Sequence, residues 1–350
     1  MKKKSRTVRT FGIMVANPRQ RKYVLRKYLA RKAAHMRLFC FTPSEIDWKR
    51  KTILGLHHAK WKWVQQRFPF PEVVYNRCYT TKKTTIERLE AAIGSSKCFN
   101  QQNRFDKYEI YKLLSQPLAP YLPETVPYDR ETAAQLLETH KVLYVKPCYG
   151  YQGKGVYRVE AKESGEIHIS QHYFSPQFVA ADVPQYQTKL DKLLGSALYL
   201  VQQGVNLQQW NDQVFDVRAL VQKDESGVWS VTNVVSRIAH KGCFNTSICD
   251  KICMSDEVLR HLYPHEKADV FLQTIRDISL KAAETVESGT GLHLGELSVD
   301  FALDNDERLW IIEVNGKPQK EIYDEFRGQD AVYKRPLQYA DYLYTHSPLH

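Results

Sequence analysis

The chain has 350 residues, of which 43% are hydrophobic and 12% aromatic, a composition that excludes an intrinsically disordered protein and predicts a folded globular one. Its formal net charge of +11 favours anionic partners, namely nucleotide phosphates, nucleic acid or an acidic protein, without choosing among them. The seven cysteines contain no C-x-x-C pair, so reduced thiols in a cytoplasmic protein are expected. No stretch of the sequence approaches the roughly 20 apolar residues of a membrane span, so the protein is expected to be soluble.

Residues 1–100 carry the pattern of a small α/β domain. Short apolar runs at 11–15, 38–41 and 73–75 predict strands, and residues 19–32 predict a helix after the first of them. One face of this helix is apolar, and the other is rich in Arg and Lys. Such a basic face is compatible with contact to nucleic acid, a membrane surface or an acidic protein, and equally with simple solvation.

The character of the sequence changes near residue 100. Residues 105–114 predict a short helix, and four prolines between 117 and 127 mark a crossing between domains. Lys107 lies near the start of this helix. It is either an ordinary surface charge or a side chain that reaches a phosphate group.

A second lysine is followed by a glycine-rich loop. Lys146 lies near the end of the apolar strand 142–147, and the loop after it contains Gly150, Gly153 and Gly155. A cation next to backbone that can approach a ligand closely is typical of anion-binding loops. The spacing differs from that of the G-x-x-x-x-G-K-[ST] loop, and a strand follows where that loop has a helix. A hairpin over phosphates and a purely structural turn both stay open.

The predicted strand 198–205 ends in two amide side chains and a glycine, which are Gln202, Gln203 and Gly204. An edge of this kind offers hydrogen-bonding groups and room for close approach to an adenine ring. On its own, this pattern does not establish a nucleotide site.

Charged residues also occur within two strands that are otherwise apolar. Asp216 and Arg218 share one face of the strand 215–221, and Arg237 lies near the end of its expected partner, 231–238. An ion pair within the sheet is one interpretation of these residues. The other is that the two arginines face a transferred phosphoryl group.

A hairpin is expected after the long helix predicted over 266–287. Apolar and β-branched residues at 295–303 and 309–316 flank a polar turn at 304–308, which is the usual signal for strand, loop and strand. The hairpin is the most informative part of the chain because its strands contain polar side chains.

Pairing of Leu303 with Trp310 would set Asp300 opposite Glu313, and Asn315 shares the face of Glu313. Like charges directly opposite each other destabilise a sheet, so a cation is expected between the two carboxylates. Hard oxygen ligands suit Mg²⁺ or Mn²⁺, with the remaining positions left to water and substrate phosphates. The alternative is an exposed hairpin whose acids face water.

In this order, the motifs resemble the ATP-grasp superfamily over residues 100–320. Within it, the chain resembles the YheC/YheD endospore coat-associated protein family over nearly its whole length. Five motifs carry the resemblance: Phe105-Asp106-Lys107-Tyr108, Val145-Lys146-Pro147, Gln202-Gln203-Gly204, Phe215-Asp216-Val217-Arg218 and Glu313-Val314-Asn315-Gly316-Lys317-Pro318. Each motif alone is weak, whereas five in the same order are specific.

The resemblance implies an α/β (α+β) fold of the ATP-grasp type. Residues 1–100 would form an N-terminal α/β pre-ATP-grasp domain. Residues 101–204 would form a linker helix and the lid subdomain, and residues 205–350 a C-terminal catalytic subdomain built on an antiparallel sheet.

The resemblance also implies a nucleotide site. Lys107 and Lys146 would hold the α- and β-phosphates of ATP, and Gln202 with the backbone around Gln203 and Gly204 would take the adenine. Many superfamily members have a carboxylate where this chain has Gln202, which weakens the expected preference for adenine. The remaining residues assigned to nucleotide binding are Gly153, Gly155 and Asp216.

By the same resemblance, Asp300, Glu313 and Asn315 would carry two Mg²⁺ ions, with Glu313 bridging both and Mn²⁺ as an alternative metal. Arg218 and Arg237, together with Asn315, would form the catalytic set that steadies the γ-phosphoryl group and an acyl-phosphate intermediate.

The implied activity is that of an ATP-dependent carboxylate–amine or carboxylate–thiol ligase acting through an acyl phosphate and associated with the endospore coat. Its partners would be ATP, unidentified carboxylate and amine substrates and an acidic coat protein, without membrane insertion. A coat component that binds ATP without turnover is the main alternative. Phosphoryl transfer to a hydroxyl and nucleic-acid binding through residues 19–32 are further ones.

Overall fold

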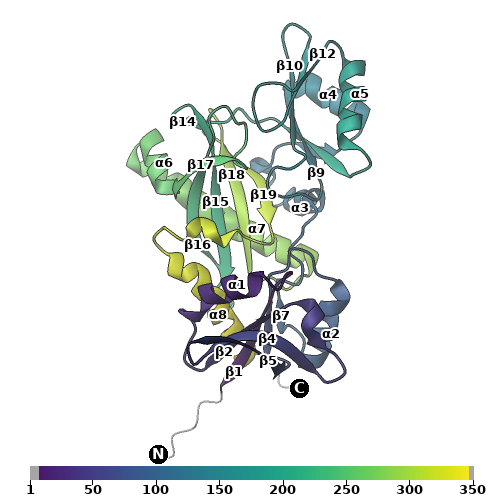
Figure 1. Cartoon of the computed structure of the whole chain (residues 1–350). Coiled ribbons are helices and arrows are strands. Elements are labelled where there is room, and N and C mark those ends of the chain that lie inside the picture. The colour runs from purple at the N-terminus through teal and green to yellow at the C-terminus, as the bar shows by residue number, and fades with distance from the viewer. Residues whose placement is uncertain (1–7, 347–350) are drawn as a thin grey trace, which may run out of the picture.

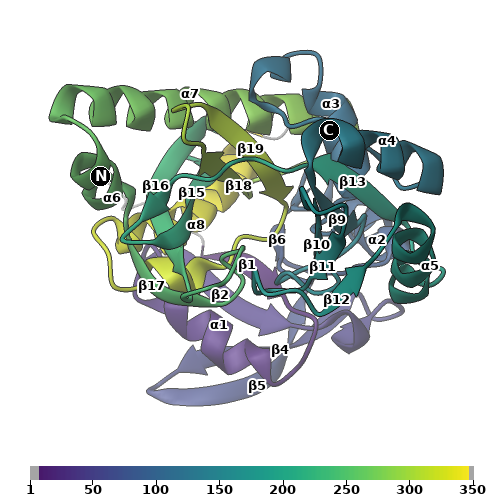
Figure 2. The same ribbon diagram turned by 90° about the horizontal axis from the view of Figure 1, so that it is seen from above.

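The structure is a computed structural model that describes residues 8–346. Its strands form three sheets that follow one another along the long axis of the molecule (Figure 1). The N-terminal sheet lies at one end, the middle sheet at the other, and the C-terminal sheet between them. Viewed from above, helix α7 runs along one side and helices α4 and α5 lie outermost on another (Figure 2).

The N-terminal sheet has seven strands, with the order β3-β4-β2-β1-β6-β7 and β5 paired to β4. Strand β1 pairs in parallel with β2 and β6, and the three apolar runs predicted as strands form these three strands, with a helix after the first of them. The elements are β1 (Arg9–Met14), α1 (Gln20–Leu29), β2 (Met36–Phe41), η1 (Pro43–Glu45), β3 (Ile46–Asp47), β4 (Thr52–Ala59), β5 (Lys62–Pro69), β6 (Val73–Asn76), α2 (Lys83–Ile93) and β7 (Cys98–Phe99).

The middle sheet has six strands in the order β12-β11-β10-β9-β13-β8, all paired antiparallel. Helices α4 and α5 pack on it around a separate apolar core. The elements are β8 (Thr125–Pro127), α4 (Arg130–His140), β9 (Val142–Pro147), β10 (Tyr157–Ala161), β11 (Ile167–Ser170), β12 (Phe178–Ala180), α5 (Val183–Leu194) and β13 (Tyr199–Gln203).

The C-terminal sheet is antiparallel, with the order β17-β16-β15-β18-β19 and β14 paired to β15. Its elements, with the helices around it, are α3 (Lys107–Leu114), η2 (Ala119–Tyr121), β14 (Gln209–Trp210), β15 (Gln213–Lys223), β16 (Trp229–Ala239), β17 (Cys249–Met254), α6 (Ser255–Leu262), α7 (His265–Thr290), β18 (Glu296–Leu303), β19 (Leu309–Asn315), η3 (Lys320–Tyr323) and α8 (Gln329–Thr345).

The two faces of the C-terminal sheet differ in character because successive side chains along a strand point to opposite sides. Val217, Ala219 and Val299 belong to the apolar core that includes helix α7. Leu220 and Val235 point the other way, into a core shared with α8 and the N-terminal sheet. The charged residues of β15 and β18 lie on this second face, between the N-terminal sheet and the middle sheet.

Helix α3 begins at Lys107, two residues later than the sequence pattern predicted. Asp106 caps it, since its carboxylate accepts hydrogen bonds from the backbone N–H groups of Tyr108 and Glu109 at 2.8 and 3.2 Å. The cap therefore fixes Lys107 in the first turn, on the same side of the helix as Ile110 and Leu114, with which it lines a pocket.

The hairpin β18–β19 forms as predicted, but the pairing at its tip was predicted wrongly. Leu303 pairs with Leu309 and not with Trp310, because the Asp304 carboxylate organises a longer turn: it accepts the backbone N–H of Arg308 at 2.8 Å and the Trp310 indole N–H at 2.7 Å. A bulge between these pairs and the site takes up one residue. Asp300 consequently lies opposite Glu313, as predicted.

Candidate functional site

Polar side chains from four adjacent strands share one face of the C-terminal sheet. The register sets Asp216 opposite Arg237, and Arg218 opposite Asp300, which in turn faces Glu313. This places on one surface the predicted residues Asp216 and Arg218 of β15, Arg237 of β16, Asp300 of β18, and Glu313 and Asn315 of β19.

Two arginine–aspartate pairs dominate this surface. Arg218 donates from Nε and Nη2 to both carboxylate oxygens of Asp300, at 2.6 and 2.5 Å. Arg237 makes a two-pronged contact with Asp216 and also reaches Oδ2 of Asp300 at 3.1 Å. Burial raises the pKa of Asp300, but the two guanidinium groups outweigh this effect and hold that pKa below its ordinary value. The ion-pair interpretation is thus seen in the structure, with partners on neighbouring strands.

The three predicted metal ligands lie together. Nδ2 of Asn315 is 3.5 Å from Oδ2 of Asp300, and Glu313 stands directly across the sheet from Asp300. Within residues 8–346 there is no group of three or more His, Cys, Asp or Glu side chains placed to hold a metal ion. Two carboxylates and one carboxamide nevertheless fit Mg²⁺, which takes few protein ligands when phosphates complete its shell. Such an ion would share Asp300 with the arginines.

The two predicted phosphate-binding lysines approach the same edge. Lys107 Nζ lies 3.3 Å from Oε1 of Glu313 and donates to the carbonyl oxygen of Gly150 at 3.2 Å. Lys146 Nζ donates to the amide oxygen of Gln202. Burial lowers the pKa of Lys146 to about 8, although the nearby charge of Glu313 opposes the shift.

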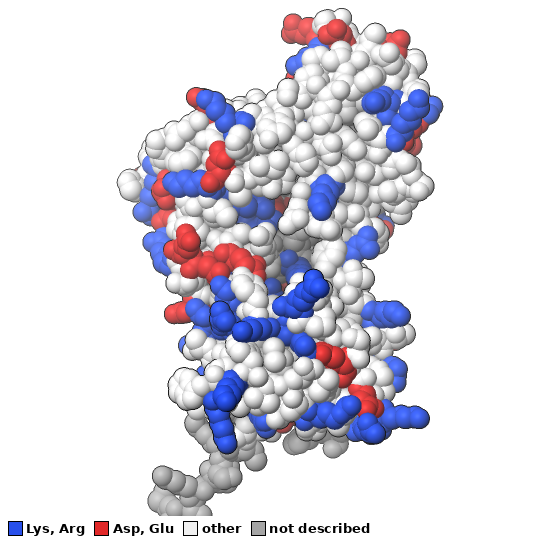
Figure 3. Space-filling view, viewed as in Figure 1, with Lys and Arg blue, Asp and Glu red and all other residues white. Residues whose placement is uncertain are grey.

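A pocket joins these residues. Lys107, Lys146, Gln202 and Glu313 line it, and the rest of its wall is largely apolar: Ile110, Leu114, Leu122, Leu200, Ile311 and Val314. Figure 3 shows a hollow at mid-height of the molecule, with basic and acidic side chains around it. A pocket with one apolar wall and one charged end suits a nucleotide, whose base is flat and whose phosphates are anionic.

The residues predicted to take the adenine are already bonded within the protein. The Gln202 amide donates to Oγ1 of Thr125 at 3.1 Å. The backbone N–H groups of Gln203 and Gly204 donate to carbonyl oxygens of neighbouring chain segments, both at 2.8 Å. A side chain at position 204 would also collide with Val142, 2.5 Å away, so the glycine has a packing role. Sequence reasoning missed Thr125 because it lies on a different strand.

The glycine-rich loop contacts two other segments of the chain, although its tyrosines Tyr149 and Tyr151 are exposed. The carbonyl of Gly150 accepts a hydrogen bond from the Tyr79 hydroxyl at 3.2 Å, besides the bond from Lys107. Gly153 has a φ of 66°, and a Cβ there would lie 2.5 Å from the hydroxyl of Ser247. Gly155 has a φ of 72°. The loop therefore meets the N-terminal segment on one side and the segment after β16 on the other.

The basic helix α1 is partly neutralised by the protein itself. Arg21 forms an ion pair with Glu45, and Lys27 with Asp324 at 2.6 Å. Arg31 contacts Asp330 at 2.8 Å. Because these charges already have partners, the arginine-rich face gives less support to nucleic-acid binding than the sequence alone.

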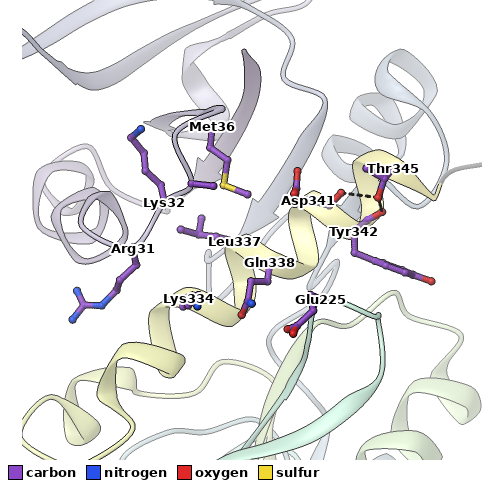
Figure 4. A pocket seen from close by; sticks show the side chains of 11 residues that line it. Arg31, Lys32, Met36, Glu225, Lys334, Leu337, Gln338, Asp341, Tyr342 and Thr345 are labelled. Atoms are coloured by element: carbon purple, nitrogen blue, oxygen red, sulfur yellow. Dashed lines mark hydrogen bonds between the residues drawn. The ribbon is translucent and has the colours of Figure 1, made fainter. Parts of the chain in front are cut away.

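A second pocket, of about 500 Å³, lies between α8, the segment after α1 and the β15–β16 turn (Figure 4). Arg31, Lys32, Glu225 and Asp341 stand around it, and Leu337 forms part of its wall. It shares no lining residue with the pocket that contains Lys107 and Lys146.

The three sheets and the charged edge between them define an ATP-grasp protein. The fold resembles that of D-alanyl-alanine synthetase A from Vibrio cholerae, with a TM-score of 0.59 and 13% identity over 97% of this chain and 100% of that one. It also resembles the ATP-grasp ligase PsnB complexed with its minimal precursor, with a TM-score of 0.56 and 15% identity over 98% and 100%. The predicted fold class is confirmed.

The YheC/D-like ATP-grasp family model matches residues 95–343, and the chain belongs to this family. Among curated proteins it is 26% identical over 327 residues to endospore coat-associated protein YheD of Bacillus subtilis strain 168, covering 87% of this chain and 70% of that one. It is 25% identical over 329 residues to YheC of the same strain, covering 89% of each. Family and fold together support an ATP-dependent, ligase-like function.

None of the helices within residues 8–346 is long and apolar enough to cross a membrane.

Proposed function

We propose that this protein is a Mg²⁺-dependent ATP-grasp ligase that activates a carboxylate as an acyl phosphate and joins it to an amine or a thiol. The main support is the convergence of Lys107, Lys146, Asp300 and Glu313 at one edge, next to a pocket with an apolar wall. Phosphoryl chemistry needs positioned charge more than a protein nucleophile, and this edge supplies it.

Each charged group has a task in this scheme. Lys107 and Lys146 bind the α- and β-phosphates of ATP, and Asp300, Glu313 and Asn315 hold Mg²⁺. The metal, when bound, offsets the charge of the β- and γ-phosphates. Three further side chains and the loop complete the site. Arg218 and Arg237 steady the transferred phosphoryl group, and Asp216 orients Arg237. The loop with Gly153 and Gly155 excludes water.

The reaction proceeds in two steps. A carboxylate oxygen of the first substrate attacks the γ-phosphorus, and the bond to ADP breaks. The amine or thiol of the second substrate then attacks the acyl carbon, loses a proton and expels inorganic phosphate. The base is bound against the wall formed by Leu200 and Ile311, with Gln202 at its rim.

We also propose that the protein is cytoplasmic and becomes associated with the spore coat, since both curated relatives are named for coat association. An ATP-binding coat component without turnover is the second candidate. One observation favours it: both oxygens of Asp300 are held by Arg218, which would compete with a catalytic metal ion.

The two candidates are separated by trapping the acyl phosphate. The purified protein is incubated with ATP, Mg²⁺, hydroxylamine and pools of amino acids and short peptides, and both ADP and hydroxamate are measured. A ligase forms hydroxamate, and Glu313→Ala abolishes it. The matched control, Glu163→Ala, changes an exposed carboxylate in a turn of the middle sheet and leaves the yield unchanged. Tight ATP binding without hydroxamate from any pool would support the coat component and contradict the ligase.

A further inference from the structure

A second buried charged cluster lies on the same face of the C-terminal sheet as the proposed ATP site. Lys320, which is 0% exposed, forms an ion pair of 2.5 Å with Glu296 of β18. The lysine also donates to the hydroxyls of Tyr75 at 2.9 Å and Tyr28 at 3.2 Å. Because both tyrosines belong to the N-terminal part of the chain, this cluster joins the N-terminal sheet to the C-terminal sheet.

Arg77 adds a cation to this cluster without adding an anion. It follows β6 directly and is 8% exposed. Its Nη1 donates to the hydroxyls of Tyr28 and Tyr75, at 2.7 and 3.2 Å. Within residues 8–346, Arg77 has no carboxylate partner in an ion pair, and Glu296 is already held by Lys320. Burial disfavours the charge of Arg77, but Tyr28, Tyr75 and the nearby charges of Glu296 and Glu321 raise its pKa, so the guanidinium stays charged without forming a direct ion pair.

Lys317 is a second cation of this kind. It lies two residues beyond Asn315, and its ammonium group makes no hydrogen bond or ion pair with any residue of the described part of the chain. Burial lowers the pKa of Lys317, and the charge of Arg77 lowers it further, which means that the two cations lie within electrostatic reach of each other.

Asn103 holds the two segments together. Its side-chain Nδ2 donates to the carbonyl oxygens of Asn76 and Cys78, the residues on either side of Arg77, at 3.0 and 2.8 Å. Its own backbone oxygen lies 3.0 Å from the position of a Cβ on Gly316, next to Lys317. The chain neighbours of Arg77 and of Lys317 therefore both lie close to Asn103.

The free nitrogens of these cations remain accessible. Nε and Nη2 of Arg77 and Nζ of Lys317 have no partner in the described structure, yet none is among its fully buried polar atoms that lack one. Each of these atoms therefore keeps some contact with solvent. A planar guanidinium with free N–H groups, beside an ammonium group, matches the two oxygens of a carboxylate.

We propose that Arg77 and Lys317 bind a carboxylate of a substrate other than ATP, and that this substrate is an amino acid or short peptide. The inference rests on the proposed ligase function. The chain from Asn315 to Lys317 spans at most about 7 Å. A carboxylate held there lies within the length of a small peptide from the groups that would bind the γ-phosphate, so the reacting group of the same molecule can reach them.

The test measures binding without ATP by calorimetry, using succinate, L-glutamate, D-glutamate and diglycine as probes and their neutral amides as controls. The wild type is expected to bind at least one carboxylate probe at least about tenfold more tightly than its amide, the effect of a charge-assisted contact. Lys317→Gln is expected to lose this preference. Lys82→Gln, the same change at an exposed lysine of the N-terminal part, retains it.

ATP binding by the same proteins separates this inference from the proposed function. Lys317→Gln is expected to bind ATP within twofold of the wild type, which also shows that it is folded. Arg77→Gln is the second variant, and if it fails to fold, Lys317→Gln still decides the matter. The inference is overturned if no carboxylate probe binds, if binding survives Lys317→Gln, or if inorganic phosphate binds in preference to every carboxylate. A wild type that binds no ATP contradicts the proposed function instead.

Discussion

Replacing Lys146 by methionine removes a charge that the fold buries beside Gln202. The pKa of Lys146 is about 8, against an ordinary value of 10.5. Keeping this lysine charged at pH 7 therefore costs the folded state about 3 kcal/mol, at about 1.4 kcal/mol for each pH unit. Lys146→Met removes this cost, but it also removes the hydrogen bond to the Gln202 amide, which lowers the stability by ~1 kcal/mol. Since part of the side chain contacts solvent, a net stabilisation of about 1 kcal/mol is expected at pH 7.

The stability gain should depend on pH in a defined direction. Because the pKa of Lys146 is lower in the folded state, the unfolded state binds more protons between pH 8 and 10.5. The unfavourable contribution is fully present below pH 8 and disappears as the pH rises towards 10.5. The advantage of Lys146→Met over the wild type should therefore shrink between pH 7 and pH 10, and a small deficit from the lost hydrogen bond should remain.

Urea unfolding of both proteins at the two pH values measures this difference, and calorimetry at pH 7 measures ATP binding. Lys146→Met should be more stable at pH 7 and bind ATP at least about tenfold more weakly, because a charged contact to phosphate is lost. Lys192→Met, at an exposed position of α5, is the matched control and should change neither quantity. A variant that is less stable at pH 7, or whose stability difference does not change with pH, would refute the reasoning.

Three other outcomes are expected. Gly153→Ala places a methyl group against the Ser247 hydroxyl at a φ of 66° and should slow turnover. Gly165→Ala, at a φ of 88° with no atom within 4 Å, should lower stability only. Steady-state kinetics and thermal unfolding distinguish the two variants. Glu296→Gln removes the carboxylate partner of the buried Lys320, and should lower the free energy of unfolding in urea by about 3–5 kcal/mol. Of the seven cysteines only Cys249 is exposed, so a thiol reagent should modify one site in the native protein, and mass spectrometry should find it at that residue.

The order and type of the elements around the site were accessible from the sequence because they rest on local patterns. The predicted pairing of Asp300 with Glu313 is observed because the bulge compensates for the one-residue error at the tip of the hairpin, and the sequence pattern did not predict this bulge. The start of α3 was misplaced because the capping role of Asp106 was not weighed, although Asp is a common residue at that position.

Contacts between distant segments were not accessible in the same way. The sequence pattern placed Asp216 and Arg218 on one face, but it could not show that each would pair with a residue of a neighbouring strand. The contact of Tyr79 with the glycine-rich loop joins positions 71 residues apart. Arg77 could not be predicted from the sequence, because a single arginine after a strand carries no local signal and its role depends on the residues that surround it in the fold.

The bulge in β19 insulates the two acids from events at the tip of their hairpin. Both the bulged ladder, with Leu303 opposite Leu309, and a regular one, with Leu303 opposite Trp310, bring Glu313 across from Asp300. A mutation that disturbs the turn can thus be absorbed by rearranging one residue, while the acidic pair stays in place. The solvent-exposed tip is accordingly the part of the hairpin that is most open to change, and a natural position for attaching a probe.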